Sequence, residues 1–261
     1  MRCSPPADTK PNPALDNLDS GWLLAGLFAL ILLSGTVQSL SGFGFALLSA
    51  PLLAATIGGP AAVSTILITG TACDIAILAM RRTLPRPDTR EVLTLAAWSA
   101  PGMLAGAWLL AALPAVGLQV FVAAIVIMAV VLRLRTQSQG VIASRRWAAP
   151  AGLASGALST STSLGGPPTV YYLVHRNLGP HVMRDTMVAL SLIRLPLTVV
   201  SLLIAGVWDT YEYWPALIIA ALLGQYLGAQ AFHRLHARYE RIVLILLTAA
   251  ALVSVATLAF H

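Results

Sequence analysis

The sequence has very little charge: only 10% of its 261 residues are Asp, Glu, Lys or Arg, whereas 57% are hydrophobic. Soluble domains usually carry about 25% charged residues, so this chain has too few to cover a globular surface. We therefore expect lipid to be its main solvent. No polar segment is long enough to fold separately, which predicts a single membrane domain.

Cysteine and histidine are also scarce, and neither is clustered. Cys3 lies in a polar tail and Cys73 in an apolar stretch, which gives no basis for a disulfide. His175 and His181 are too few to form a metal site. Before His261 no histidine lies inside an apolar stretch, so the nucleophile–base pair of an intramembrane enzyme is missing. We expect no catalytic residue, no metal and no cofactor.

Lysine is nearly absent, since Lys10 is the only one, yet the net charge is +6. Most of the positive charge comes from arginines in three loops between apolar stretches, at 81–91, 133–146 and 233–241. Such loops indicate membrane orientation by the positive-inside rule, not binding to nucleic acid. We therefore expect these loops in the cytoplasm, the chain in a bacterial inner membrane, and both termini on the periplasmic side.

The apolar stretches predict an all-α, polytopic membrane protein, because a helix needs about 20 residues to cross a bilayer. The stretches long enough for full transmembrane helices are 59–80, 92–112, 114–132, 183–205, 214–232 and 242–260. Two pairs of shorter stretches, 22–40 with 42–57 and 148–164 with 166–174, are each interrupted by glycine or proline. Counting crossings between the charged loops makes each pair re-entrant, the first from outside and the second from inside. The two halves then have opposite orientations.

Small residues at matching positions support this inverted repeat independently. The matches are Ser34-Gly35 with Ser155-Gly156, Gly44 with Gly165, and Gly102-x-x-x-Gly106 with Gly224-x-x-x-Gly228. Pairs of small residues four apart let membrane helices pack closely. The chain is accordingly divided into a polar tail (1–20), a first membrane repeat (21–134), a basic cytoplasmic linker (135–147) and a second membrane repeat (148–261).

Interrupted membrane helices at corresponding positions of two repeats indicate a binding site. A new helix N-terminus exposes free N–H groups, and its positive dipole end favours an anion. Glycine lets the backbone approach a ligand, and Pro167-Pro168 suit a first helical turn. We expect a small oxyanion between the two breaks, near the midplane. The predicted ligands there are Gln38, Ser41, Gly42, Phe43, Gly44, Thr162, Ser163, Gly165 and Gly166, with five consecutive hydroxyl residues at 159–163.

Two charged residues lie inside the predicted spans, Arg194 and Asp74. An arginine in hydrocarbon is costly and is by default functional. Arg194 is therefore included in the predicted substrate site, with a structural pair to an acid as the alternative. Asp74 is the candidate for that pair, or for carrying a coupling proton. Inversion places the two residues on opposite sides of the midplane, so their pairing is left open.

The two interrupted segments resemble the glycine-rich motifs of the TauE/SafE sulfite exporter family. The first is Ser-Gly-Phe-Gly-Phe-Ala-Leu-Leu-Ser-Ala-Pro-Leu-Leu at 41–53. The second is Leu-Gly-Gly-Pro-Pro-Thr-Val-Tyr-Tyr-Leu at 164–173, followed by Met-Arg-Asp-Thr at 183–186. The similarity extends over essentially the whole chain after residue 21. It implies a secondary transporter for sulfite or an organosulfonate.

Other functions stay open at this stage. The same architecture can form an anion channel, and a membrane anchor subunit without enzymatic activity is a weaker alternative. A carrier would use either a proton or a sodium ion for coupling. Membrane lipid and a small anion are the expected partners, and a homodimer is left open.

Overall fold

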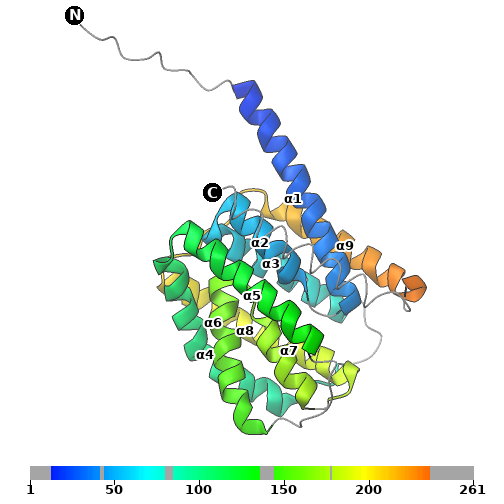
Figure 1. The fold of residues 1–261 in the computed structure, drawn as a ribbon. Helices are drawn as coiled ribbons and strands as arrows, with labels where there is room; N and C mark the ends of the chain where they lie inside the picture. Colours follow the sequence, from blue (N-terminus) through cyan, green and yellow to red (C-terminus); the bar gives the residue numbers. More distant parts are fainter. Residues whose placement is uncertain (1–12, 42–43, 80–84, 136–143, 177, 236–261) are drawn as a thin grey trace, which may run out of the picture.

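The computed structural model describes residues 13–41, 44–79, 85–135, 144–176 and 178–235, and every regular element in those ranges is a helix (Figure 1). The elements are α1 Pro13–Ser41, α2 Phe45–Ile57, α3 Gly59–Ala79, α4 Thr89–Ala112, α5 Ala115–Arg135, the short 3-10 helix η1 Arg145–Trp147, α6 Ala148–Thr162, α7 Gly166–His175, α8 Pro180–Ile204 and α9 Trp214–Leu235. The prediction of an all-α polytopic membrane protein is confirmed.

Among the described residues, four helices are long and apolar enough to cross a membrane. Their spanning segments are Gly21–Ser39, Gly59–Ala79, Thr89–Ala112 and His181–Ile204. The last three match predicted full spans. Helix α5 runs over 21 residues and covers nearly all of the predicted span at 114–132. The predicted span at 242–260 lies outside the described residues.

The first helix is longer than the sequence pattern indicates. Helix α1 has 29 residues and begins at Pro13, so it includes the end of the predicted polar tail. Its segment Gly21–Ser39 could cross a membrane by length alone, whereas we expected it to be one short arm of a re-entrant pair. Proline suits the first helical position because its missing N–H has no intrahelical partner there.

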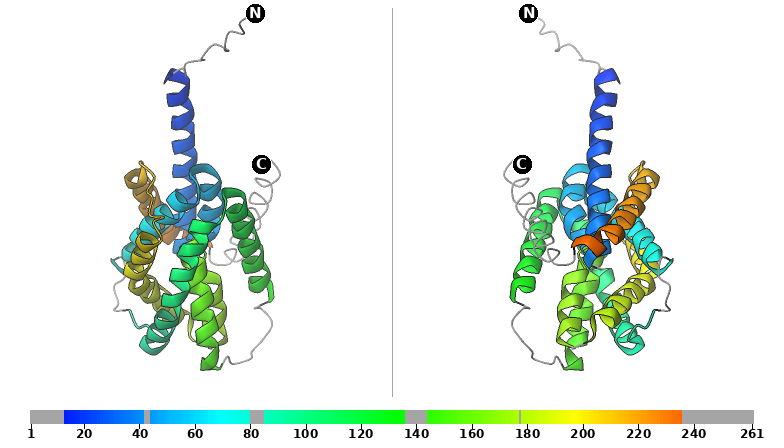
Figure 2. Two further views of the ribbon diagram at one scale, coloured as in Figure 1. Left: turned by 90° about the vertical axis from the view of Figure 1, so that its left-hand side faces the viewer. Right: turned by 90° about the vertical axis from the view of Figure 1, so that its right-hand side faces the viewer.

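Both predicted interruptions occur. Helix α1 ends at Ser41 and α2 begins at Phe45, after Gly44 in the left-handed region with φ of 114°. Helix α6 ends before Ser163, which has φ of 62°, and α7 begins at Gly166. In the side views of Figure 2, α1 enters the bundle from above, whereas α6 and α7 occupy its lower part. The two breaks are therefore approached from opposite ends of the bundle.

The two halves pack their helices in the same way, α1 against α9 and α4 against α6. A Cβ on Gly224 of α9 would overlap the carbonyl oxygen of Leu32, and one on Gly102 of α4 would overlap that of Leu153. Leu153 follows Leu32 by 121 residues and Gly224 follows Gly102 by 122, so the contacts correspond. This is the packing that an internal repeat produces. The inverted repeat itself and the orientation of each half across the membrane stay predictions.

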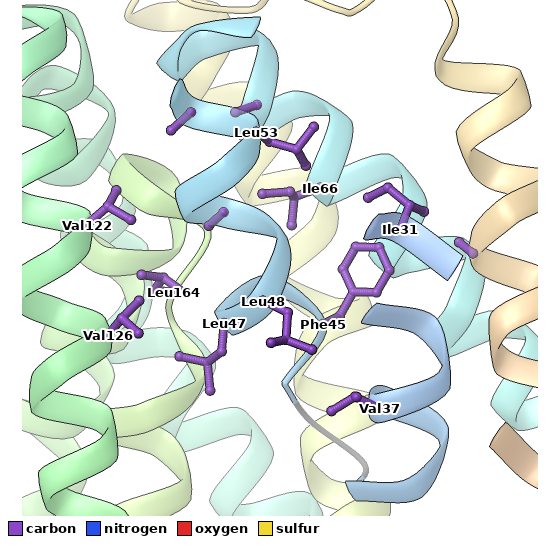
Figure 3. Close-up of a cluster of buried hydrophobic side chains, with 14 of the residues drawn as sticks. Ile31, Val37, Phe45, Leu47, Leu48, Leu53, Ile66, Val122, Val126 and Leu164 are labelled. Atoms are coloured by element: carbon purple, nitrogen blue, oxygen red, sulfur yellow. The ribbon is translucent and has the colours of Figure 1, made fainter. Parts of the chain in front are cut away.

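A cluster of buried apolar side chains surrounds α2 and joins the two breaks (Figure 3). Its labelled members are Ile31 and Val37 of α1, Phe45, Leu47, Leu48 and Leu53 of α2, Ile66 of α3, Val122 and Val126 of α5, and Leu164 between α6 and α7. Leu164 belongs to the second break and is only 1% exposed. The second break is thus anchored in the apolar core of the first half.

Candidate functional site

Both breaks border one cavity of roughly 200 Å³. Its wall is formed by the end of α1, the first turn of α2, the middle of α3, the end of α6, the start of α7 and the middle of α8. The N-termini of α2 and α7 therefore meet at a single space inside the helix bundle. Such a meeting of the two helix tips is what the repeat predicts.

The structure brings most of the predicted site residues together. The predicted residues that line the cavity are Gln38, Gly44, Asp74, Ser163, Gly165, Gly166 and Arg194. Thr162 is buried outside the lining, and its hydroxyl donates to the carbonyl of Leu158 at 2.9 Å. Ser41 ends α1, and its side chain is not among those described. Gly42 and Phe43 lie outside the described residues.

The run of five hydroxyl residues divides into two groups. Thr160, Ser161 and Thr162 donate to backbone carbonyls, those of Met103, Ala157 and Leu158 respectively. Only Ser159 and Ser163 line the cavity. Ser159 lies in the last turn of α6 and Ser163 directly follows the helix, so this end of α6 presents two hydroxyls to the cavity and not five.

The two glycines at the start of α7 have different surroundings. A Cβ on Gly165 would lie 2.6 Å from the carbonyl oxygen of Ser155 and 2.8 Å from Cβ of Ser159. A Cβ on Gly166 would have nothing within 4 Å beyond its chain neighbours, and Gly166 lines the cavity. Gly165 is therefore required for close packing against α6, whereas Gly166 leaves open space in front of the helix N-terminus.

The guanidinium of Arg194 is buried with neutral partners. The side chain is only 7% exposed. Its Nε donates to Oγ of Ser99 at 2.9 Å, and its Nη1 donates to Oγ of Ser155 at 2.8 Å. The carbonyl of Leu95 lies 3.5 Å from Nη2. A guanidinium has five N–H donors, so donors remain for a further acceptor.

Ser155 connects Arg194 to the second break. Its hydroxyl donates to the carbonyl of Gly165 and accepts from Oγ1 of Thr169 at 2.7 Å, besides accepting from Arg194. A hydroxyl has one donor and two acceptor positions, and all three are used. The position of the guanidinium is thus fixed relative to the N-terminus of α7.

Asp74 lines the same cavity and is also 7% exposed. Nε2 of Gln38 donates to its Oδ1 at 3.0 Å, and Ser191 also forms a hydrogen bond with the carboxylate. Within the described part of the chain, Asp74 and Arg194 form no ion pair with each other or with any other residue. The structural pair considered from the sequence is therefore absent from this structure.

A charged network that the sequence did not predict lies at the other end of α7. Glu91 of α4 is 1% exposed and accepts from the hydroxyl of Tyr172 at 2.8 Å and from Nε of Arg176 at 3.1 Å. Arg145 lies 3.4 Å from the same carboxylate. These contacts join α4, α7 and the segment before α6. Sequence reasoning used the arginines only for orientation, and nothing in the local pattern paired them with Glu91.

Comparison with known proteins identifies the protein family. No curated protein and no solved structure matches the chain. The family model described as sulfite exporter TauE/SafE matches residues 27–255, which include both breaks, Asp74 and Arg194. The chain therefore belongs to the sulfite exporter TauE/SafE family.

Proposed function

We propose that the chain is a secondary transporter that moves a small sulfur-containing oxyanion, sulfite or an organosulfonate, across the bacterial inner membrane. Membership of the family supports membrane transport of sulfite or related anions. One observation carries the assignment to this cavity: Arg194 is a buried cation without a carboxylate partner among the described residues, and it borders a space between two helix N-termini.

The charge of Arg194 favours an anion there. Burying an ion costs several kcal/mol unless a counter-charge and hydrogen bonds compensate. Ser99, Ser155 and Leu95 supply hydrogen bonds but no counter-charge. A bound oxyanion would supply both, and the planar guanidinium is suited to gripping two oxygens at once.

The helix N-termini add to this attraction. Each carries a partial positive charge of roughly half a unit, and free N–H groups suit oxyanion ligands. Gly44 and Gly166 line the cavity at the starts of α2 and α7, and a Cβ on Gly166 would meet nothing within 4 Å beyond its chain neighbours. The hydroxyl of Ser159 also lies in the lining, and that of Ser163, which donates to the carbonyl of Val63 at 3.4 Å, borders the same space. Small oxyanions fit this set of short, fixed donors better than large organic acids.

Flux through purified protein tests the proposal. Reconstituted vesicles should take up labelled sulfite or methanesulfonate with a rate that saturates with concentration. The variant Arg194→Lys keeps the charge without the planar fork and should retain partial flux, whereas Arg194→Ala should retain almost none. Arg146→Ala removes an exposed arginine outside the cavity and serves as the matched control, with flux expected to equal that of the wild type.

Three results would speak against this assignment. Normal flux in a well-folded Arg194→Ala protein would remove Arg194 from the site. A rate that rises linearly with anion concentration would favour the anion channel over the carrier. Wild-type vesicles that take up none of these anions would refute the proposed substrate class.

A further inference from the structure

The cavity contains two opposite charges that do not neutralise each other by contact. Among the lining residues, only Asp74 and Arg194 have ionisable side chains. Arg194 donates to Ser99 and Ser155, while Asp74 accepts from Gln38, so each is held by neutral groups. The empty cavity therefore has a net charge of zero when both residues are ionised.

An arriving anion changes this balance. A monoanion beside Arg194 leaves the cavity with a net charge of −1, because Asp74 is still ionised. A net charge inside a membrane protein is costly, since the surroundings solvate it poorly. One proton on the carboxylate of Asp74 would restore neutrality. A dianion would still leave a charge of −1 after that proton is added.

The surroundings of Asp74 favour a proton over a metal cation as the balancing charge. Hard cations bind where several oxygen ligands converge, but Oδ1 of Asp74 accepts from the N–H donor Nε2 of Gln38 at 3.0 Å. In the part of the chain that the structure describes, no three His, Cys, Asp or Glu side chains gather to hold a metal ion. A neutral carboxyl needs no such ligand set.

Among the described residues, no other group near Asp74 can take up this proton at neutral pH. The groups that share the cavity with it, or lie beside it, include Gln38 of α1, Phe45 of α2, Ser163 after α6, and Ser191 and Arg194 of α8, with the Ala221 carbonyl on the side of α9. Of these only Arg194 is charged. Cys73, the neighbour on α3, is buried and directs its thiol to the Ala221 carbonyl at 3.7 Å.

We propose that Asp74 takes up one proton as the anion binds, so that the site carries one monoanion together with one proton. The inference rests on the proposed function and deepens it. The preferred species are then an organosulfonate or hydrogen sulfite, and dianions such as sulfate are disfavoured. The proton comes from the side on which the anion enters and leaves with it on the other side.

Calorimetry with methanesulfonate, which stays a monoanion at all relevant pH values, tests this coupling. Because binding takes up a proton, the wild-type affinity for methanesulfonate should fall about tenfold for each unit that the pH rises. This holds over the pH range in which Asp74 of the empty protein is ionised. Asp74→Asn mimics the protonated carboxyl, so it should bind methanesulfonate at every pH as the wild type does at low pH. Asp209→Asn makes the same change at an exposed residue outside the cavity and should keep the wild-type slope.

A second measurement does not depend on how the variant folds. In weakly buffered solution, wild-type protein should take up one proton per methanesulfonate bound, and sulfate should bind at least about tenfold more weakly. Wild-type affinity that is independent of pH, or an unchanged slope in folded Asp74→Asn, would overturn the coupling while leaving the anion site intact. Binding of no anion at any pH would instead refute the proposed function, and the coupling with it.

Discussion

The two adjacent glycines at the start of α7 allow packing and ligand access to be separated experimentally. We expect Gly165→Ala to damage mainly the fold. Its new Cβ would lie 2.6 Å from the carbonyl oxygen of Ser155, closer than side chains pack, so α6 or α7 must shift. Overpacking of this kind costs about 1–3 kcal/mol. Because Ser155 also holds Arg194, anion affinity should fall as well.

Gly166→Ala should give the opposite pattern. Beyond its chain neighbours, the new methyl group would have nothing within 4 Å and would project into the cavity. Gly166 precedes Pro167, which disfavours the helical region for alanine, so a stability loss of about 1 kcal/mol is expected from the backbone. Methanesulfonate affinity should fall at least about tenfold, since the methyl group occupies space that a ligand oxygen needs.

Thermal unfolding and calorimetry on the same preparations distinguish these effects. Unfolding reports the loss of stability in each variant, and calorimetry at low pH reports methanesulfonate affinity. Wild-type affinity in Gly166→Ala would show that the open space before α7 is not the anion site. Wild-type stability in Gly165→Ala would show that the close contact with Ser155 is not needed for packing.

Two further predictions concern the charged network around Glu91 and the predicted orientation of the loop before α4. Glu91→Gln weakens the charged contacts with Arg176 and Arg145, so the free energy of unfolding should fall by about 2 kcal/mol. Anion affinity should stay unchanged. Equal melting temperatures for the variant and the wild type would contradict this expectation. Arg90→Cys, in a chain lacking Cys3, should react with an impermeant thiol reagent only after cells are opened. Labelling in intact cells would reverse the predicted orientation.

The breaks and their pairing could be predicted because their signals are local. The glycine-containing run at 41–44 and the Gly-Gly-Pro-Pro run at 165–168 interrupt apolar stretches, and Gly44 and Gly165 stand at matching positions in the two halves. The same holds for the close contacts of Gly102 and Gly224, which follow from small residues four apart. These features depend on backbone sterics and therefore appear directly in the sequence.

The partners of the buried charges could not be predicted because they depend on how distant helices rotate against each other. Ser99 and Arg194 are 95 positions apart, and nothing near Ser99 marks it as the acceptor. The pairing of Glu91 with Arg176 is hidden for the same reason. The sequence overestimated the number of hydroxyls at the site, because consecutive residues of a helix point in different directions. Thr162 directs its hydroxyl to the carbonyl of Leu158, whereas Ser163 lines the cavity.

The central claim is that an oxyanion binds between Arg194 and the N-terminus of α7. A crystal structure with 2-bromoethanesulfonate tests it directly, because the bromine locates the ligand by anomalous scattering. We predict one site in the cavity, with sulfonate oxygens in hydrogen-bond contact with the guanidinium of Arg194 and the N–H of Gly166. A ligand bound instead at the arginines near Glu91, or a cavity without ligand at saturating concentration, would contradict the account.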